Sequence, residues 1–310
     1  RGLVPGTLSA YYKQQVKWSR GTFELLFTVY PKLFKHFTWR QRIHYGTLPL
    51  YYLFGVFNLI DFLIPSLALI MAEFPWYVSL GEFLIMFTPF FLISIAIRQY
   101  AQRWYHEKNE KGFHMFGGIL RTGTWWIFLL GLVYSIFRVK VPYIPTPKDD
   151  KPKNNWLLSL PNILMIGLML GAIAYSQHLY GHLYTNPYVQ MMAMFSLVNI
   201  GILGSVVVIG QEKFIQWVRH HVLHANALQP VLQPLRLAIW RTRHSFYDGI
   251  RYVAIVITMA SVAVSTSFLL FGYKPYNTPQ RQDRPLVQKP VKSGTRTHTN
   301  QPASLVTTPE

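Results

Sequence analysis

Apolar runs long enough to cross a bilayer alternate with polar segments along this chain. A helix needs about 20 predominantly apolar residues to cross the hydrocarbon core, and five runs meet that length. We therefore expect an all-α, polytopic membrane protein with five transmembrane helices. The five runs are Leu48–Ala72, Val78–Ile97, Leu157–Tyr175, Tyr188–Ile209 and Tyr252–Gly272.

The distribution of positive charge predicts which segments face the cytoplasm. The loops 73–77 and 181–187 contain neither Lys nor Arg, whereas four longer segments are basic. Because cytoplasmic segments are enriched in Lys and Arg, we expect the two loops outside and the basic segments inside. The basic segments are 1–47 with eight Lys or Arg residues, 98–121 with five, 138–153 with five and 210–251 with six.

A sixth apolar run, Trp125–Phe137, is shorter and has basic flanks. Its length fits a helix that lies in the membrane interface as well as one that crosses the membrane. The charge pattern is satisfied only if the chain does not cross between 98–121 and 138–153. We therefore expect this run to be interfacial or re-entrant.

Two polar regions complete the organisation. Residues 211–251 combine His, Arg and aromatic residues around Pro230 and Pro234, which predicts a pair of amphipathic helices on the inner membrane surface. The tail after Gly272 has no apolar periodicity, which predicts disorder or a linker. We expect an interfacial region (1–47), a transmembrane pair (48–97), cytoplasmic interfacial helices with a loop (98–156), a second transmembrane pair (157–209), the amphipathic region (210–251), a last transmembrane helix (252–272) and the tail (273–310).

Composition supports the membrane assignment and limits the chemistry. Charged residues make up 14% of the chain, against about 25% in soluble domains. Lys and Arg outnumber Asp and Glu by 30 to 12, which is typical of proteins that bind nucleic acid, anionic lipids or an anionic substrate. Nucleic acid is disfavoured because the basic residues follow the membrane topology. The chain contains no cysteine, so disulfides and cysteine nucleophiles are excluded in it. Its first residue is Arg1, and we expect a C-terminal piece of a longer polypeptide.

The first segment with candidate chemistry is Gln14-Gln15-Val16-Lys17-Trp18, just before the first long apolar run. A helix places Gln14, Lys17 and Trp18 on one face. Trp offers a flat apolar surface for a sugar ring, and a cation can hold phosphate oxygens. Composition alone favours an interfacial anchor, because Trp and basic residues gather at the ends of transmembrane helices.

The second such segment is Val141–Asp150, which contains three prolines within six residues. The prolines forbid a helix and favour a semi-rigid, extended loop at the membrane surface. Thr146 and Lys148 supply a hydroxyl and an ammonium group suited to a diphosphate, and Tyr143 has a ring that can stack on a base. A rigid linker is the alternative interpretation, and it is favoured without further information.

Asp61 lies in the middle of the first long apolar run, where a charge costs a few kcal/mol. A structural partner on a neighbouring helix and a polar channel lining explain it equally well. The pairs His178/His182 and His220/His224 have a spacing known from metal ligands. No carboxylate accompanies them, so we predict interfacial histidines and no metal site.

Together the segments Gln14–Trp18 and Val141–Asp150 resemble parts of the C-terminal half of bacterial cellulose-synthase-like, processive family-2 glycosyltransferases. That family has a Gln-x-x-Arg-Trp motif on an interfacial helix before a pair of transmembrane helices, and a gating loop Phe-x-Val-Thr-x-Lys before the next pair. Gln14-x-x-Lys17-Trp18 matches the first motif and Tyr143-x-Pro145-Thr146-x-Lys148 the second, in the same order. The resemblance covers roughly residues 1–210.

The resemblance implies roles for these positions. Trp18 would stack against the terminal sugar of the growing glucan, and Gln14 would help to hold the acceptor end. Lys17, Thr146 and Lys148 would bind the diphosphate of the donor, with Tyr143 against its base. The partners implied are a nucleotide sugar, with UDP-glucose favoured, and the growing glucan in addition to the lipid bilayer.

Three departures from the family pattern bear on these roles. Lys17 replaces Arg and loses the planar, bidentate geometry of a guanidinium. Tyr143 replaces Phe, and Pro145 replaces Val, which stiffens the loop. The nucleotide-binding domain is missing, with its catalytic Asp residues and the Mg or Mn that they would hold. We therefore expect neither a catalytic residue nor a metal in this chain, and no activity from the chain alone.

The function expected from these observations is the membrane part of a UDP-sugar-dependent hexosyltransferase. It would polymerise a sugar on the cytoplasmic side of the bacterial inner membrane and export the polysaccharide. A transporter or channel without chemistry is the alternative, for which Asp61 is the best argument. A membrane anchor for a soluble assembly is a third possibility, and a partner subunit stays open.

Overall fold

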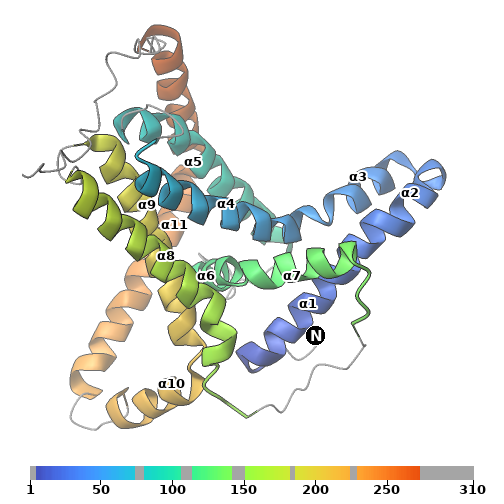
Figure 1. The fold of residues 1–310 in the computed structure, drawn as a ribbon. Helices are drawn as coiled ribbons and strands as arrows, with labels where there is room; N and C mark the ends of the chain where they lie inside the picture. The colour runs from blue at the N-terminus through green and yellow to red at the C-terminus, as the bar shows by residue number, and fades with distance from the viewer. Residues whose placement is uncertain are drawn as a thin grey trace, which may run out of the picture. The chain divides into compact units, whose positions relative to one another are not determined.

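The computed structural model of the chain describes residues 5–73, 80–105, 114–141, 151–181, 186–223 and 229–272. This part is 88% helical and contains no β-strand, so the expected all-α fold is confirmed (Figure 1). The α-helices are α1 (Leu8–Glu24), α2 (Tyr30–Leu33), α3 (Trp39–Thr47), α4 (Leu50–Met71), α5 (Leu80–Tyr105), α6 (Met115–Gly123), α7 (Trp125–Ile136), α8 (Trp156–Tyr180), α9 (Pro187–Ile209), α10 (Glu212–Val218) and α11 (Gln229–Ser267).

Four helical segments in the described residues are long and apolar enough to cross a membrane. They correspond to the first four expected transmembrane helices, and the polytopic membrane fold is therefore confirmed. The first of them runs through α3 and α4 without a sharp bend, so it begins earlier than the apolar pattern indicates. The four segments are Trp39–Met71, Gly81–Gln102, Trp156–Leu179 and Pro187–Ile209.

The last expected transmembrane helix and the amphipathic stretch before it form one continuous helix, α11. No proline follows Pro234 within α11, so nothing interrupts its backbone hydrogen bonds at residue 252. The apolar part, Val256–Phe271, is shorter than the four segments described above. The hydrophobic pattern therefore located the apolar part but not the helix boundary.

The sixth apolar run forms the second half of a bent helix pair. Helices α6 and α7 meet at Thr124 with an angle of 48° between them, an arrangement found in broken spans and re-entrant loops. The twelve residues of α7 rise about 18 Å, less than the hydrocarbon core of about 30 Å. Helix α7 alone is thus too short to cross, but the bent pair of α6 and α7 is compatible with one broken span as well as with a re-entrant loop, so the interfacial or re-entrant arrangement stays a prediction.

Asn162 of α8 holds this bend. Its side-chain Nδ2 donates to the carbonyl oxygen of Gly123, 3.1 Å away, and its Oδ1 accepts from Trp125 Nε1 at 2.9 Å. Asn162 is fully buried. Because a helix bend leaves backbone groups without intrahelical partners, the amide of Asn162 replaces a hydrogen bond that the bend removes.

Helix α7 packs between α1 and α4 at two close approaches. A methyl group added at Gly131 would lie 2.7 Å from Ser19 Cβ of α1, and one added at Gly55 of α4 would lie 2.6 Å from the carbonyl oxygen of Trp125. Phe128, between the two contacts, is fully buried. Small residues at these crossings permit helices to approach closely, as is usual in membrane proteins.

We expect Gly131→Ala to destabilise the packing of α1 on α7. The added methyl would overlap Ser19, and such overpacking costs about 1–3 kcal/mol. Thermal unfolding in detergent measures the effect. Gly167→Ala in α8 is the matched control, because a methyl there would meet nothing within 4 Å. Equal melting temperatures for the two variants would contradict the close approach.

Candidate functional site

Helix α1 carries the first motif and presents it on the side away from α7. The helix begins at the cap Thr7, whose side chain accepts from Ala10 N. Its buried side includes Tyr12, Ser19 and Phe23, and burial raises the pKa of the Tyr12 hydroxyl. Gln14 and Lys17 are half-buried, and Trp18 is exposed. The first motif therefore lies on the free side of a helix that is firmly docked by its other side.

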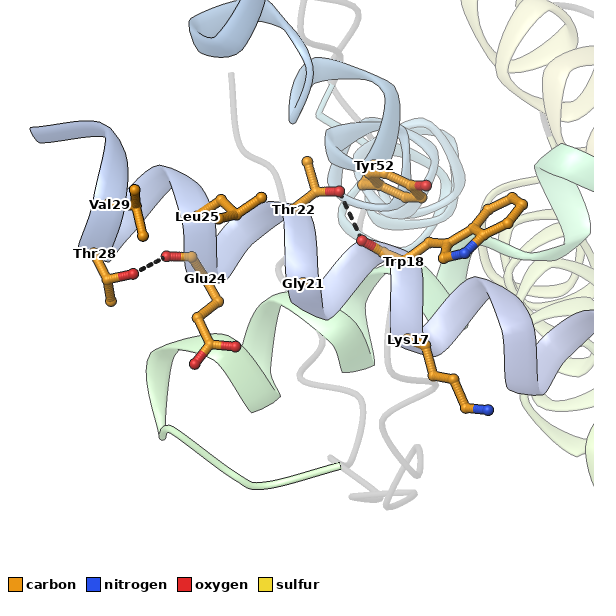
Figure 2. Close-up of a pocket in the computed structure, with 9 residues that line it drawn as sticks. All are labelled: Lys17, Trp18, Gly21, Thr22, Glu24, Leu25, Thr28, Val29 and Tyr52. Carbon is orange, nitrogen blue, oxygen red and sulfur yellow. Dashed lines mark hydrogen bonds between the residues drawn. The ribbon is translucent and has the colours of Figure 1, made fainter. Parts of the chain in front are cut away.

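A groove of about 560 Å³ runs along this free side (Figure 2). Tyr52 of α4 forms part of its wall beside Trp18, whose indole is 52% exposed. Thr22 Oγ1 donates to the carbonyl oxygen of Trp18 at 2.7 Å. The residues that line the groove are Lys17, Trp18, Gly21, Thr22, Glu24, Leu25, Thr28, Val29 and Tyr52.

The far end of the groove lies on a π-helical turn, Leu25–Val29, which directly follows α1. Such turns widen a helix locally and are frequent at functional sites. Glu24, just before the turn, pairs with Arg20, whose Nη1 lies 3.1 Å from Glu24 Oε2. The pair is partly exposed, with Arg20 the more buried partner, and it places one carboxylate on the rim of the groove.

The groove combines groups that suit a carbohydrate. The exposed indole of Trp18 offers an aromatic face on which the apolar side of a sugar ring can pack, whereas Tyr52 is buried against Phe23 and Phe128 and forms only the wall beside it. Thr22, Thr28 and Glu24 offer oxygen atoms for hydrogen bonds to sugar hydroxyls. Figure 2 shows the indole of Trp18 near Tyr52, whereas the side chain of Lys17, which also lines the groove, extends away from both rings. The aromatic and cationic parts of the motif are thus separated around the helix.

The second motif lies outside the described residues. Tyr143, Thr146 and Lys148 all fall within 142–150, and the structure describes the chain again from Lys151. The segment that begins at Lys151 is held by hydrogen bonds to the turn between α9 and α10. Asn155 N and Nδ2 both donate to the carbonyl oxygen of Gly210, at 3.2 and 3.1 Å, and Lys153 N donates to Glu212 Oε2 at 3.1 Å.

Asp61 has a partner on a neighbouring helix. Asn199 Nδ2 of α9 donates to Asp61 Oδ2 at 3.1 Å, which agrees with the first of the two explanations given for this residue. Asp61 is nevertheless exposed in this chain, while Asn199 is buried. Asn58, one turn earlier on α4, is buried and its Nδ2 has no hydrogen-bond partner. The three residues form a polar band across two transmembrane helices.

Two residues that matter here, Tyr52 and Glu212, are not among the candidates predicted from the sequence. Tyr52 lies within an apolar run next to Tyr51, and nothing local distinguishes the two. Glu212 carried a signal that was overlooked, because it is the only acidic residue between Asp150 and Asp248. A lone carboxylate at the end of a transmembrane helix, surrounded by basic residues, indicates a specific structural contact.

Comparison with known proteins finds a distant cellulose-synthase-like relationship. The chain is similar to the cellulose synthase catalytic subunit [UDP-forming] of Pseudomonas fluorescens (strain SBW25), with 23% identity over 218 residues. The similarity covers 68% of this chain but spans only 29% of the length of that relative. No family model matches the chain, and no solved structure matches it.

The absence of native cysteine makes the groove testable by labelling. We expect Trp18→Cys to react with a membrane-impermeant maleimide in inside-out vesicles, because position 18 is exposed and the basic segment 1–47 is predicted to be cytoplasmic. Ser19→Cys is the control and should stay unlabelled, since Ser19 is fully buried. Labelling of Trp18→Cys in right-side-out vesicles alone would reverse the topology.

Proposed function

We propose that this chain is the membrane and channel part of a processive β-glycosyltransferase. The enzyme would polymerise a nucleotide sugar on the cytoplasmic side of the bacterial inner membrane and export the product. UDP-glucose and a cellulose-like glucan are the favoured donor and product. The observation that carries the proposal is the groove between Trp18 and Tyr52, which lies on the motif helix of a chain related to a cellulose synthase subunit.

Under this proposal the groove binds the acceptor end of the glucan. The terminal sugar packs against the Trp18 indole, and Gln14, one turn before it on the same helix, donates to or accepts from a sugar hydroxyl. Tyr52 limits the space beside the indole and so restricts how the ring lies. Lys17 also lines the groove, but its side chain extends away from Trp18 and Tyr52, and under the proposal it serves the diphosphate of the donor.

Thr146 and Lys148 complete donor binding in this proposal, with Tyr143 against the base. Negative charge develops on the diphosphate when it leaves, and an ammonium group stabilises that charge. Under this proposal the catalytic Asp residues, and the Mg or Mn that they would hold, would lie outside the residues of this chain. The residues of this chain bind and orient the substrates, and the chain alone is inactive.

The transmembrane helices would provide the path for the product. The Asp61–Asn199 pair is the best candidate for its polar lining, because the carboxylate is exposed although it lies within a transmembrane helix. A carboxylate that faces hydrocarbon raises the free energy of the folded protein by a few kcal/mol. A hydrated path that contains the glucan would remove that cost, because water and sugar hydroxyls can donate hydrogen bonds to the carboxylate.

The proposal predicts selective loss of polymerisation in the full-length polypeptide. Trp18→Ala should lower kcat/KM for glucan synthesis about 30-fold, since a central Trp commonly contributes that much to binding. Lys148→Ala should lower it about 100-fold through the lost charge on the diphosphate. Incorporation of radiolabelled UDP-glucose into insoluble glucan measures both effects.

Two matched controls lie close in the sequence but away from the groove. Trp39 is 70% exposed on α3, and Lys151 is exposed just after the second motif. Trp39→Ala and Lys151→Ala should retain the activity of the unmodified enzyme within about twofold. Full activity of both Trp18→Ala and Lys148→Ala would rule out the proposed function.

A further inference from the structure

The carboxylate of Glu212 joins three segments that are far apart in the chain. Its Oε1 accepts from Leu8 N, the first amide of α1, at 2.6 Å. Its Oε2 accepts from Lys153 N at 3.1 Å, and its own backbone N donates to the carbonyl oxygen of Lys153 at 3.2 Å. Figure 1 shows the first turns of α1, α8 and α10 converging at this point.

The contact suits the electrostatics of α1. The first amides of a helix have no partner within the helix, and the side chain of the cap Thr7 accepts from Ala10 N, two residues beyond Leu8. Glu212 supplies an acceptor for the Leu8 amide, and its negative charge interacts favourably with the positive end of the helix dipole. A charged acceptor makes each of its hydrogen bonds stronger than a neutral one would.

Packing around the carboxylate leaves this junction little freedom. Leu8 is buried and packs with Tyr12 and Ile127. A methyl group added at Gly210 would lie 3.1 Å from Leu8 Cδ2 and 3.0 Å from Ser159 Oγ. The start of α1 therefore lies directly against the turn between α9 and α10, at the level where Asn155 is hydrogen-bonded to Gly210.

We infer that Glu212 is a positioning residue that holds α1 and the segment after residue 150 in a fixed relation. The inference rests on the proposed function, in which α1 carries the acceptor-binding Trp18 and Lys148 lies shortly before that segment. Ten residues separate Leu8 from Trp18, a rise of about 15 Å along a rigid helix. A shift at the Leu8 end of α1 is thus transmitted to the groove.

Hydrogen–deuterium exchange of this chain in nanodiscs tests the hydrogen bonds of Glu212 with Leu8 and Lys153, and it requires no enzymatic activity. Glu212→Gln keeps the size of the side chain and one acceptor oxygen, and Glu212→Ala removes both acceptors. We expect the amides of Leu8 and Lys153 to exchange about tenfold faster in Glu212→Ala, with a smaller increase in Glu212→Gln and unchanged exchange in α4. Glu73→Gln, at an exposed position, is the control. Unchanged exchange at both amides in Glu212→Ala would overturn the inference.

Kinetics of the full-length polypeptide then separate positioning from a merely structural role. We expect Glu212→Gln to raise KM for UDP-glucose about fivefold while kcat changes less than about twofold. The substitution would shift the substrate-binding residues of α1 relative to Lys148 but would leave the reacting groups unchanged. A lower kcat with unchanged KM would indicate a smaller folded fraction and would overturn the inference. Failure of the proposed function appears separately, as full activity of Trp18→Ala and Lys148→Ala.

Discussion

The close approach of α7 to α1 and α4 is the constraint on which the candidate site depends. Lipid tails are as apolar as the side chains of the helices, so the hydrophobic effect contributes little to helix association within a bilayer. Backbones must instead approach closely enough for extensive van der Waals contact. Gly131 and Gly55 permit this approach on the two sides of α7. As a result Trp18 of α1 and Tyr52 of α4 line the same groove.

The fully buried Asn162 and the half-buried Glu212 fix helix positions that close packing alone would leave adjustable. Asn162 satisfies backbone and side-chain groups at the bend between α6 and α7, and Glu212 satisfies amides at the beginnings of two segments. Dispersion contacts tolerate small sliding movements, but a hydrogen bond with a buried partner does not, since leaving a buried group unpaired costs about 1–3 kcal/mol. These two residues set the register of the helices that surround the groove.

The division of α1 into a docked side and a free side links the fold to the proposed chemistry. Tyr12, Ser19 and Phe23 hold the helix against its neighbours, and this leaves Trp18 exposed at a fixed place. A large exposed aromatic ring on a rigid element suits a binding surface, because little conformational entropy is lost when a ligand packs on it. The same indole on a mobile segment would act only as an interfacial anchor.

The sequence by itself determined the all-α membrane class, the places of the first four transmembrane helices and the helix that carries Gln14, Lys17 and Trp18. These features depend on the composition and periodicity of one segment at a time. An apolar segment of sufficient length partitions into the bilayer whatever the rest of the chain does. Only the tertiary structure decided that Tyr52 borders Trp18, that Asn199 partners Asp61 and that Glu212 joins Leu8 to Lys153. Each of these contacts unites residues from different helices, and it exists because the crossings of α7 fix how those helices lie. No local pattern encodes such a crossing, since it depends on which small residues face each other after the chain has folded.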